Sequence, residues 1–102
     1  MALQSVSLEL HVDAVPPRVV VGGELETSTA ATFTRRLASI LRTHPRIVLD
    51  IRAVRFLDSA GLRALFVHRD NLMAVLVDET SPPARALALS GLGMVIPLTR
   101  GA

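Results

Sequence analysis

The chain has 102 residues, which is enough for one domain with a single hydrophobic core. Half of the residues are hydrophobic and 20% are charged, a composition typical of a compact globule and not of a disordered chain. The absence of cysteine excludes disulfides, thiolate catalysis and zinc-thiolate sites. No apolar run is long enough to span a bilayer, and the N-terminus lacks a signal-peptide pattern. We therefore expect a single cytoplasmic domain over residues 1–102, without membrane insertion.

The sequence pI near 11.0 does not indicate nucleic-acid binding. All eleven basic residues are arginine and the chain has no lysine or tyrosine, so a net charge of only +2 persists to high pH. The arginines are scattered over several segments, and three phenylalanines offer few surfaces on which bases stack. No nucleic-acid partner is expected.

The first two predicted elements are strands joined by a turn. Hydrophobic and polar residues alternate over residues 6–12, which is typical of a strand at a sheet edge with one buried face. Residues 13–17 contain two prolines, and a strand with three consecutive valines resumes over residues 18–21, so the pair is predicted to form an antiparallel hairpin. Gly22 and Gly23 are expected to end the second strand, with residues 24–28 as a loop.

A helix and a central strand follow. Thr27, Ser28 and Thr29 all offer helix caps, after which hydrophobic residues recur at helical spacing up to Leu41. His44 and the proline after it close this amphipathic helix. Residues 47–51 form an almost unbroken apolar run, which is typical of a parallel strand buried on both faces between helices.

The second half of the chain continues the alternation of helix and strand. A second helix is predicted from Ser59 to near Asn71, followed by a buried strand over residues 73–77. Ser81 and a proline after it start the last helix, which Gly91 ends. Residues 94–96 are predicted to form a brief strand limited to an edge, because the proline that follows has no N–H donor.

The resulting order predicts an α/β fold. We expect a mixed, mostly parallel β-sheet with an N-terminal antiparallel hairpin, right-handed crossovers and three helices packed against it.

The chemistry centres on Ser59, at the predicted start of the second helix. The first amides of a helix have no intrahelical partner and carry partial positive charge, so they are expected to hold a phosphate on Ser59 without refolding. Asp58 adds a carboxylate beside the hydroxyl, and Gly61 allows another molecule to approach the backbone closely. The simpler alternative is that Ser59 is only an N-cap, with Asp58 as a competing cap.

Catalysis is the least supported class of function. The nucleophile-elbow motif requires glycine two residues before the serine, where this chain has Leu57. The three histidines are scattered and have no paired carboxylate spacing, so neither a catalytic base nor a metal site is predicted. A chain without lysine has no phosphate-binding Gly-Lys loop. We therefore expect a binding module and not an enzyme.

Three stretches of the chain resemble the STAS family, which includes the anti-sigma factor antagonists. A strand ending in Leu49-Asp50 is followed by Val54, Phe56 and the run Leu57-Asp58-Ser59-Ala60-Gly61-Leu62, which is similar to the family signature. Gly23-Glu24-Leu25 with Thr29 resembles a second family element, and Ser90-Gly91-Leu92 resembles a third. The family's fold is similar to the one predicted from the pattern of elements.

The resemblance implies a switch operated by phosphorylation. In anti-sigma factor antagonists the unmodified domain binds a serine-kinase anti-sigma factor and releases a sigma factor; the kinase then phosphorylates a serine, and a serine phosphatase resets the cycle. Carried over, Ser59 is the phosphoacceptor and Asp58 helps the kinase to recognise it. The implied partner-binding residues are Glu26, Asp58, Ser59, Ala60, Gly61 and Leu62. ATP and magnesium would belong to the kinase, so no cofactor is expected here.

Two other functions stay open. In the first alternative, the chain is a STAS subunit that docks constitutively on a membrane transport ATPase. In the second, it is a scaffold in a signalling complex. The intact Asp58-Ser59-Ala60-Gly61 motif in a free-standing chain favours the antagonist. The helix after Ser59 is about one turn shorter than is usual in the family, and this favours neither.

Overall fold

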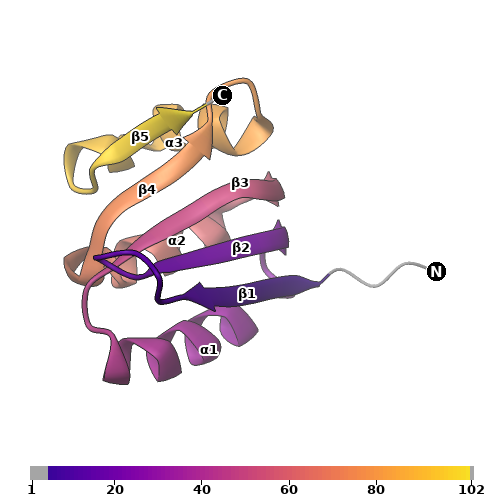
Figure 1. The fold of residues 1–102 in the computed structure, drawn as a ribbon. Helices are drawn as coiled ribbons and strands as arrows, with labels where there is room; N and C mark the ends of the chain where they lie inside the picture. Colours follow the sequence, from indigo (N-terminus) through magenta and orange to yellow (C-terminus); the bar gives the residue numbers. More distant parts are fainter. Residues whose placement is uncertain (1–4, 102) are drawn as a thin grey trace.

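Five strands and three α-helices make up residues 5–101, which the computed structural model describes (Figure 1). The strands are β1 (Val6–His11), β2 (Arg18–Leu25), β3 (Ile47–Leu57), β4 (Leu72–Asp78) and β5 (Leu98–Gly101). The helices are α1 (Ala30–Thr43), α2 (Ser59–Val67) and α3 (Pro82–Ser90), with short 3-10 turns η1 (Arg69–Asn71) and η2 (Leu92–Met94). The predicted α/β class with three helices is confirmed.

The strands lie in the sheet in the order in which they occur along the chain. β1 and β2 are antiparallel, and every later neighbour pair is parallel, so the predicted mixed sheet with an N-terminal hairpin is confirmed. Right-handed crossovers that always step in the same direction leave their helices on the same face of the sheet. The helices contact one another accordingly, α1 with α2 and α2 with α3. The prediction that residues 47–51 are buried between helices on both faces is therefore wrong.

The hydrophobic core lies between the sheet and these helices. Phe33 and Leu37 of α1, Leu65 of α2 and Leu87 of α3 are almost completely buried. They pack against the inward side chains of the strands, which include Val19, Val21, Leu25, Ile47, Leu49, Ile51 and Val75. Each helix thus presents an apolar stripe to the sheet, as the helical spacing of these residues indicates.

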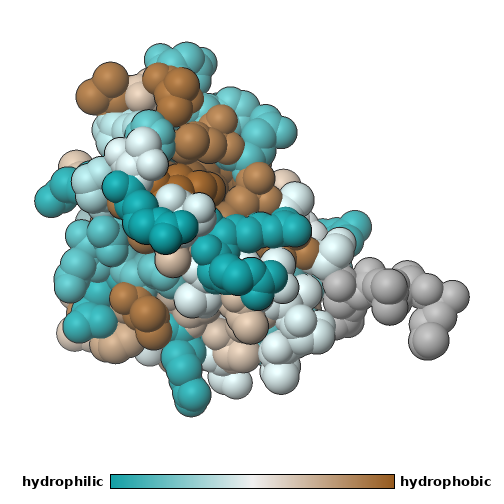
Figure 2. Space-filling view, turned by 90° about the horizontal axis from the view of Figure 1, so that it is seen from below, coloured by the Kyte–Doolittle hydropathy of each residue, from teal (hydrophilic) through white to brown (hydrophobic). Residues whose placement is uncertain are grey.

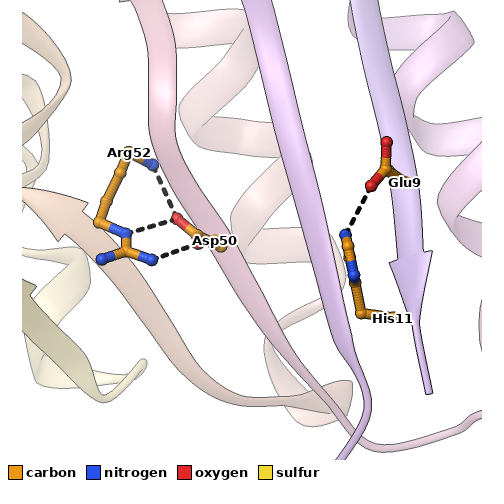
Figure 3. A network of polar contacts seen from close by, with 4 residues as sticks. All are labelled: Glu9, His11, Asp50 and Arg52. Carbon is orange, nitrogen blue, oxygen red and sulfur yellow. Dashed lines mark hydrogen bonds and ion pairs between the residues drawn. The ribbon is translucent and has the colours of Figure 1, made fainter. Parts of the chain in front are cut away.

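The other face of the sheet carries charged side chains. Asp50 is only 4% exposed, and its two carboxylate oxygens accept hydrogen bonds from Arg52 at 3.0 and 2.7 Å (Figure 3). Burial opposes ionisation of Asp50, but the hydrogen bonds from Arg52 and the charge of Arg18 outweigh it and hold its pKa below the usual value. On β1, His11 and Glu9 lie 2.7 Å apart on this same face (Figure 3). Sequence analysis named Asp50 only as part of the family signature and predicted no contact for it.

Two strands are longer than predicted. β2 continues through Gly22 and Gly23 to Leu25, with register shifts on either side of the glycines. Gly23 has φ of +91°, and a Cβ at this position would lie 2.2 Å from the carbonyl oxygen of Ser5. The glycine therefore permits a bulge in a continuing strand where a strand end was expected. β3 likewise runs beyond residue 51 to Leu57.

Two predictions near the helix ends are wrong. α2 ends at Val67, and the stretch up to Asn71 is the separate 3-10 turn η1. Residues 94–96 are not a strand: η2 ends at Met94, and Ile96 is buried in the core. The last strand begins only after Pro97, whose carbonyl accepts a hydrogen bond from the amide of Val75. Proline has no N–H to donate to a neighbouring strand, but its carbonyl oxygen still accepts a hydrogen bond from one.

Figure 2 views the molecule from below Figure 1, the side on which α1 lies. Hydrophobic and hydrophilic residues both reach the surface on this side. Phe66, Val67, Met94 and Val95 are large hydrophobic residues that are exposed. No helix within residues 5–101 has the length and apolar character that crossing a membrane requires.

Candidate functional site

The candidate site lies where β3 passes into α2. Leu57 ends the strand, Asp58 has an extended backbone with φ of −110° and ψ of −170°, and Ser59 is the first residue of the helix. The prediction that Ser59 lies at a helix start is confirmed, and its side chain is exposed.

The carboxylate of Asp58 caps this helix. Oδ1 accepts hydrogen bonds from the amides of Ala60 and Gly61 at 2.9 and 3.1 Å. Asp58 is therefore the N-cap, and Ser59 is not. This differs from the expectation that the helix-start amides would receive a phosphate on Ser59, because the carboxylate already occupies two of them.

The second carboxylate oxygen of Asp58 reaches across to the segment that precedes α1. Oδ2 accepts hydrogen bonds from the backbone amide and the hydroxyl of Thr27, both at 3.2 Å. Partial burial opposes ionisation of Asp58, but the hydrogen bonds from Gly61, Thr27 and Ala60 outweigh it and lower its pKa. A negative charge therefore sits immediately beside the hydroxyl of Ser59 at neutral pH.

Thr27 belongs to a loop that is itself well fixed. The amide of Glu26 donates to the hydroxyl oxygen of Thr29 at 3.0 Å, and that hydroxyl donates to the carbonyl of Glu24 at 2.7 Å. The hydroxyl of Ser28 donates to the carboxylate of Glu26. The structure thus brings the loop of Glu26 next to Asp58. Sequence analysis considered Thr27 only as a helix cap and missed this contact.

Gly61 has a packing role inside the domain. It is buried, and a Cβ would lie 2.4 Å from the carbonyl oxygen of Leu25 and 2.6 Å from Cδ1 of Leu57. The missing side chain lets α2 lie directly against the end of β2. The expectation that another molecule approaches the backbone at Gly61 is therefore wrong, because this chain's own strand occupies that space.

Apolar grooves run along both sides of α2. The α1–α2 groove is lined by Ala30, Ala31, Thr34, Arg35, Ala60, Arg63, Ala64 and Val67. The α2–η2 groove is lined by Leu62, Arg63, Phe66, Ser90, Gly91, Leu92, Met94 and Val95. Met94 is 91% exposed and Phe66 is 44% exposed, so this surface is unusually apolar for one facing water. Leu62 and Ala60, both half-buried, border these grooves.

The three histidines lie away from Ser59. His68 is buried at the far end of α2, with Nδ1 2.9 Å from the carbonyl oxygen of Ala64. His11 lies on the open face of the sheet, and His44 caps the C-terminal end of α1. The described part of the chain contains no group of side chains suited to hold a metal ion.

The fold and the site together define a small α/β domain with an exposed serine at a helix start, flanked by apolar grooves. The STAS domain model matches residues 11–100, and the chain belongs to this family. A crystal structure described as an anti-sigma factor antagonist from Mycobacterium paratuberculosis is similar to it, with a TM-score of 0.84 and 26% sequence identity. That similarity covers 98% of this chain and 90% of the other. Comparison with curated proteins gave no match.

Proposed function

We propose that this protein is an anti-sigma factor antagonist that works as a phosphorylation-switched binding module. In its unmodified form it binds an anti-sigma factor that is also a serine kinase, and so releases a sigma factor. The kinase phosphorylates Ser59 and thereby ends the complex, and a serine phosphatase restores the unmodified form. The protein itself is not an enzyme and acts in the cytoplasm.

The observation that carries this proposal is the exposed hydroxyl of Ser59 at the first residue of α2. A kinase needs a hydroxyl that reaches its active site without unfolding of the substrate, and Ser59 meets this requirement. The hydroxyl is not the N-cap, so its modification leaves the hydrogen bonds of Asp58 to the helix intact.

The surface beside Ser59 supports docking of a protein partner. The α2–η2 groove contains Phe66, Met94 and Val95, all exposed in the free chain. Large apolar residues that become buried when a complex forms carry much of the affinity in protein interfaces. The partner-binding residues we assign are Glu26, Asp58, Ser59, Ala60 and Leu62. Gly61 supports this surface from below through its packing on Leu25 and Leu57.

Electrostatics account for release of the partner. A phosphate adds between one and two negative charges at neutral pH, next to the ionised carboxylate of Asp58. A partner surface complementary to the neutral hydroxyl then faces concentrated negative charge. Similarity to a structure described as an anti-sigma factor antagonist supports the same role here.

The test is a binding and phosphorylation assay with proteins of the source cell. The unmodified chain is expected to retain a kinase-type ATPase, and that partner with ATP is expected to add one phosphate, which mass spectrometry places at Ser59. Ser59→Asp should bind about tenfold more weakly or worse, equivalent to about 1.4 kcal/mol.

The matched control is Ser39→Asp, which adds the same charge at an exposed position of α1. It should bind like the unmodified chain. Equal binding by Ser59→Asp, or retention of a transport ATPase in place of the kinase, would contradict the switch and favour constitutive docking.

A further inference from the structure

Arg63 lies one helical turn beyond Ser59 on α2. Residues four apart on a helix share a face, with Cβ atoms about 6 Å apart. Both side chains are exposed, so water and not the core separates them. Among residues 5–101, Arg63 has no hydrogen bond or ion pair that would hold its guanidinium elsewhere.

A phosphate on Ser59 finds few donors other than Arg63. The amides of Ala60 and Gly61 point at Oδ1 of Asp58, and the amide and hydroxyl of Thr27 donate to its Oδ2. The ionised carboxylate of Asp58, the residue before Ser59, repels the phosphate. Two of the amides that usually hold an anion at a helix start are thus engaged before the phosphate arrives.

We propose that Arg63 binds the phosphate of phosphorylated Ser59 through an ion pair within α2. This inference rests on the phosphorylation of Ser59 proposed above and names the residue that receives the phosphate. An anionic group placed four residues before a cation is the favourable orientation on a helix, and guanidinium pairs with phosphate through two parallel hydrogen bonds. The phosphate of a serine monoester is the ligand.

The pairing also changes the docking surface. Arg63 borders both the α1–α2 groove and the α2–η2 groove, so its side chain separates the two apolar surfaces. When the guanidinium moves toward the phosphate, both grooves lose their shared charged rim. Phosphorylation therefore removes a positive group from the partner's reach and adds a negative one.

The experiment uses the full chain with phosphoserine installed at position 59 by genetic encoding, so that no kinase is needed. Phosphorus NMR follows the second ionisation of the phosphate at low salt in this protein and in its Arg63→Gln variant. The phosphate pKa is expected to be about 0.3 units lower with Arg63 than with glutamine, as an exposed pair on one helix predicts. Arg63→Lys keeps the charge and should retain most of this shift.

Arg35→Gln is the matched control, because Arg35 is exposed and lines the same α1–α2 groove from the other helix. It should leave the phosphate pKa unchanged. High salt should reduce the effect of Arg63, since exposed ion pairs are screened. Equal pKa values with and without Arg63, or an equal shift on loss of Arg35, would overturn the inference. Neither result bears on whether the kinase modifies Ser59, which the assay with cellular partners decides.

Discussion

The carboxylate of Asp58 joins Thr27 to the start of α2, across 31 positions of sequence. One oxygen caps the helix and the other holds the loop before α1. The segment that carries Glu26 and the helix that carries Ser59 are thus fixed relative to each other. The two segments therefore form one preformed surface.

Asp58→Ala is expected to destabilise the protein by about 1 kcal/mol, the usual loss when a helix N-cap is removed. The variant also leaves the amides of Ala60 and Gly61 without their acceptor. Urea denaturation followed by circular dichroism measures the change. Ser59→Ala is the neighbouring control and should stay within about 0.5 kcal/mol of the parent, because its exposed hydroxyl is not the cap. A loss for Asp58→Ala no larger than that for Ser59→Ala would contradict the special role of Asp58 as the cap.

Gly61→Ala is expected to cost about 2 kcal/mol, the range seen when atoms are forced into a packed core. The added Cβ would overlap the carbonyl oxygen of Leu25 at 2.4 Å, and a backbone atom of a central strand yields little. Gly93→Ala is the matched control, since its Cβ would meet only a methyl group of Leu98 at 3.2 Å. Thermal unfolding should separate the two variants, and similar midpoints would contradict the packing argument.

Asp50→Asn is expected to reduce stability by about 2 kcal/mol at pH 7, because the hydrogen bonds between the carboxylate and Arg52 are charge-assisted. The pKa of Asp50 is lower in the folded protein than in the unfolded chain, so its contribution is present above the unfolded value, about 3.9, and is lost as pH falls through the folded value. The difference between parent and variant should therefore shrink in acid. Denaturation at a series of pH values measures it. A constant difference between parent and Asp50→Asn across the pH series would refute this account.

Met94→Ser is expected to weaken partner binding about tenfold while leaving the free energy of unfolding nearly unchanged. Its side chain is 91% exposed, so replacing it removes little from the core, but it belongs to the α2–η2 groove beside Ser59. Leu89→Ser is the control, because Leu89 is similarly exposed at 83% and lies outside that groove. Calorimetric titration with the partner should distinguish them. Equal losses, or none, would move the docking surface elsewhere.

The periodic segments were predictable because local pattern determines them. Alternation over residues 6–12 and helical spacing up to Leu41 depend on side chains that are neighbours in sequence. Gly22 and Gly23 misled the prediction because two glycines resemble a turn, whereas their pairing with β1 and β3 continues the strand. That pairing is set by distant residues and leaves no local signal.

The candidate site likewise has features that local sequence predicts and features that depend on distant residues. Ser59 at a helix start follows from the adjacent Asp58 and the apolar spacing after it. The contact of Asp58 with Thr27 depends on how two loops meet at the end of the sheet. The packing role of Gly61 in α2 depends on Leu25 of β2, which is distant in sequence. The pair of Asp50 and Arg52 had a usable signal, because residues two apart on a strand share a face.

The order of strands in space also bears on how the chain folds during synthesis. Because neighbours in the sheet are also consecutive in the chain, each strand from β2 onward pairs with the strand synthesised just before it. A short turn joins β1 to β2, whereas each later neighbour is reached through a helix, so the parallel pairings close longer loops and are expected to form more slowly than the hairpin. Within residues 5–101, β5 lies at the edge of the sheet and pairs with β4, so the pairings among the first four strands do not depend on it.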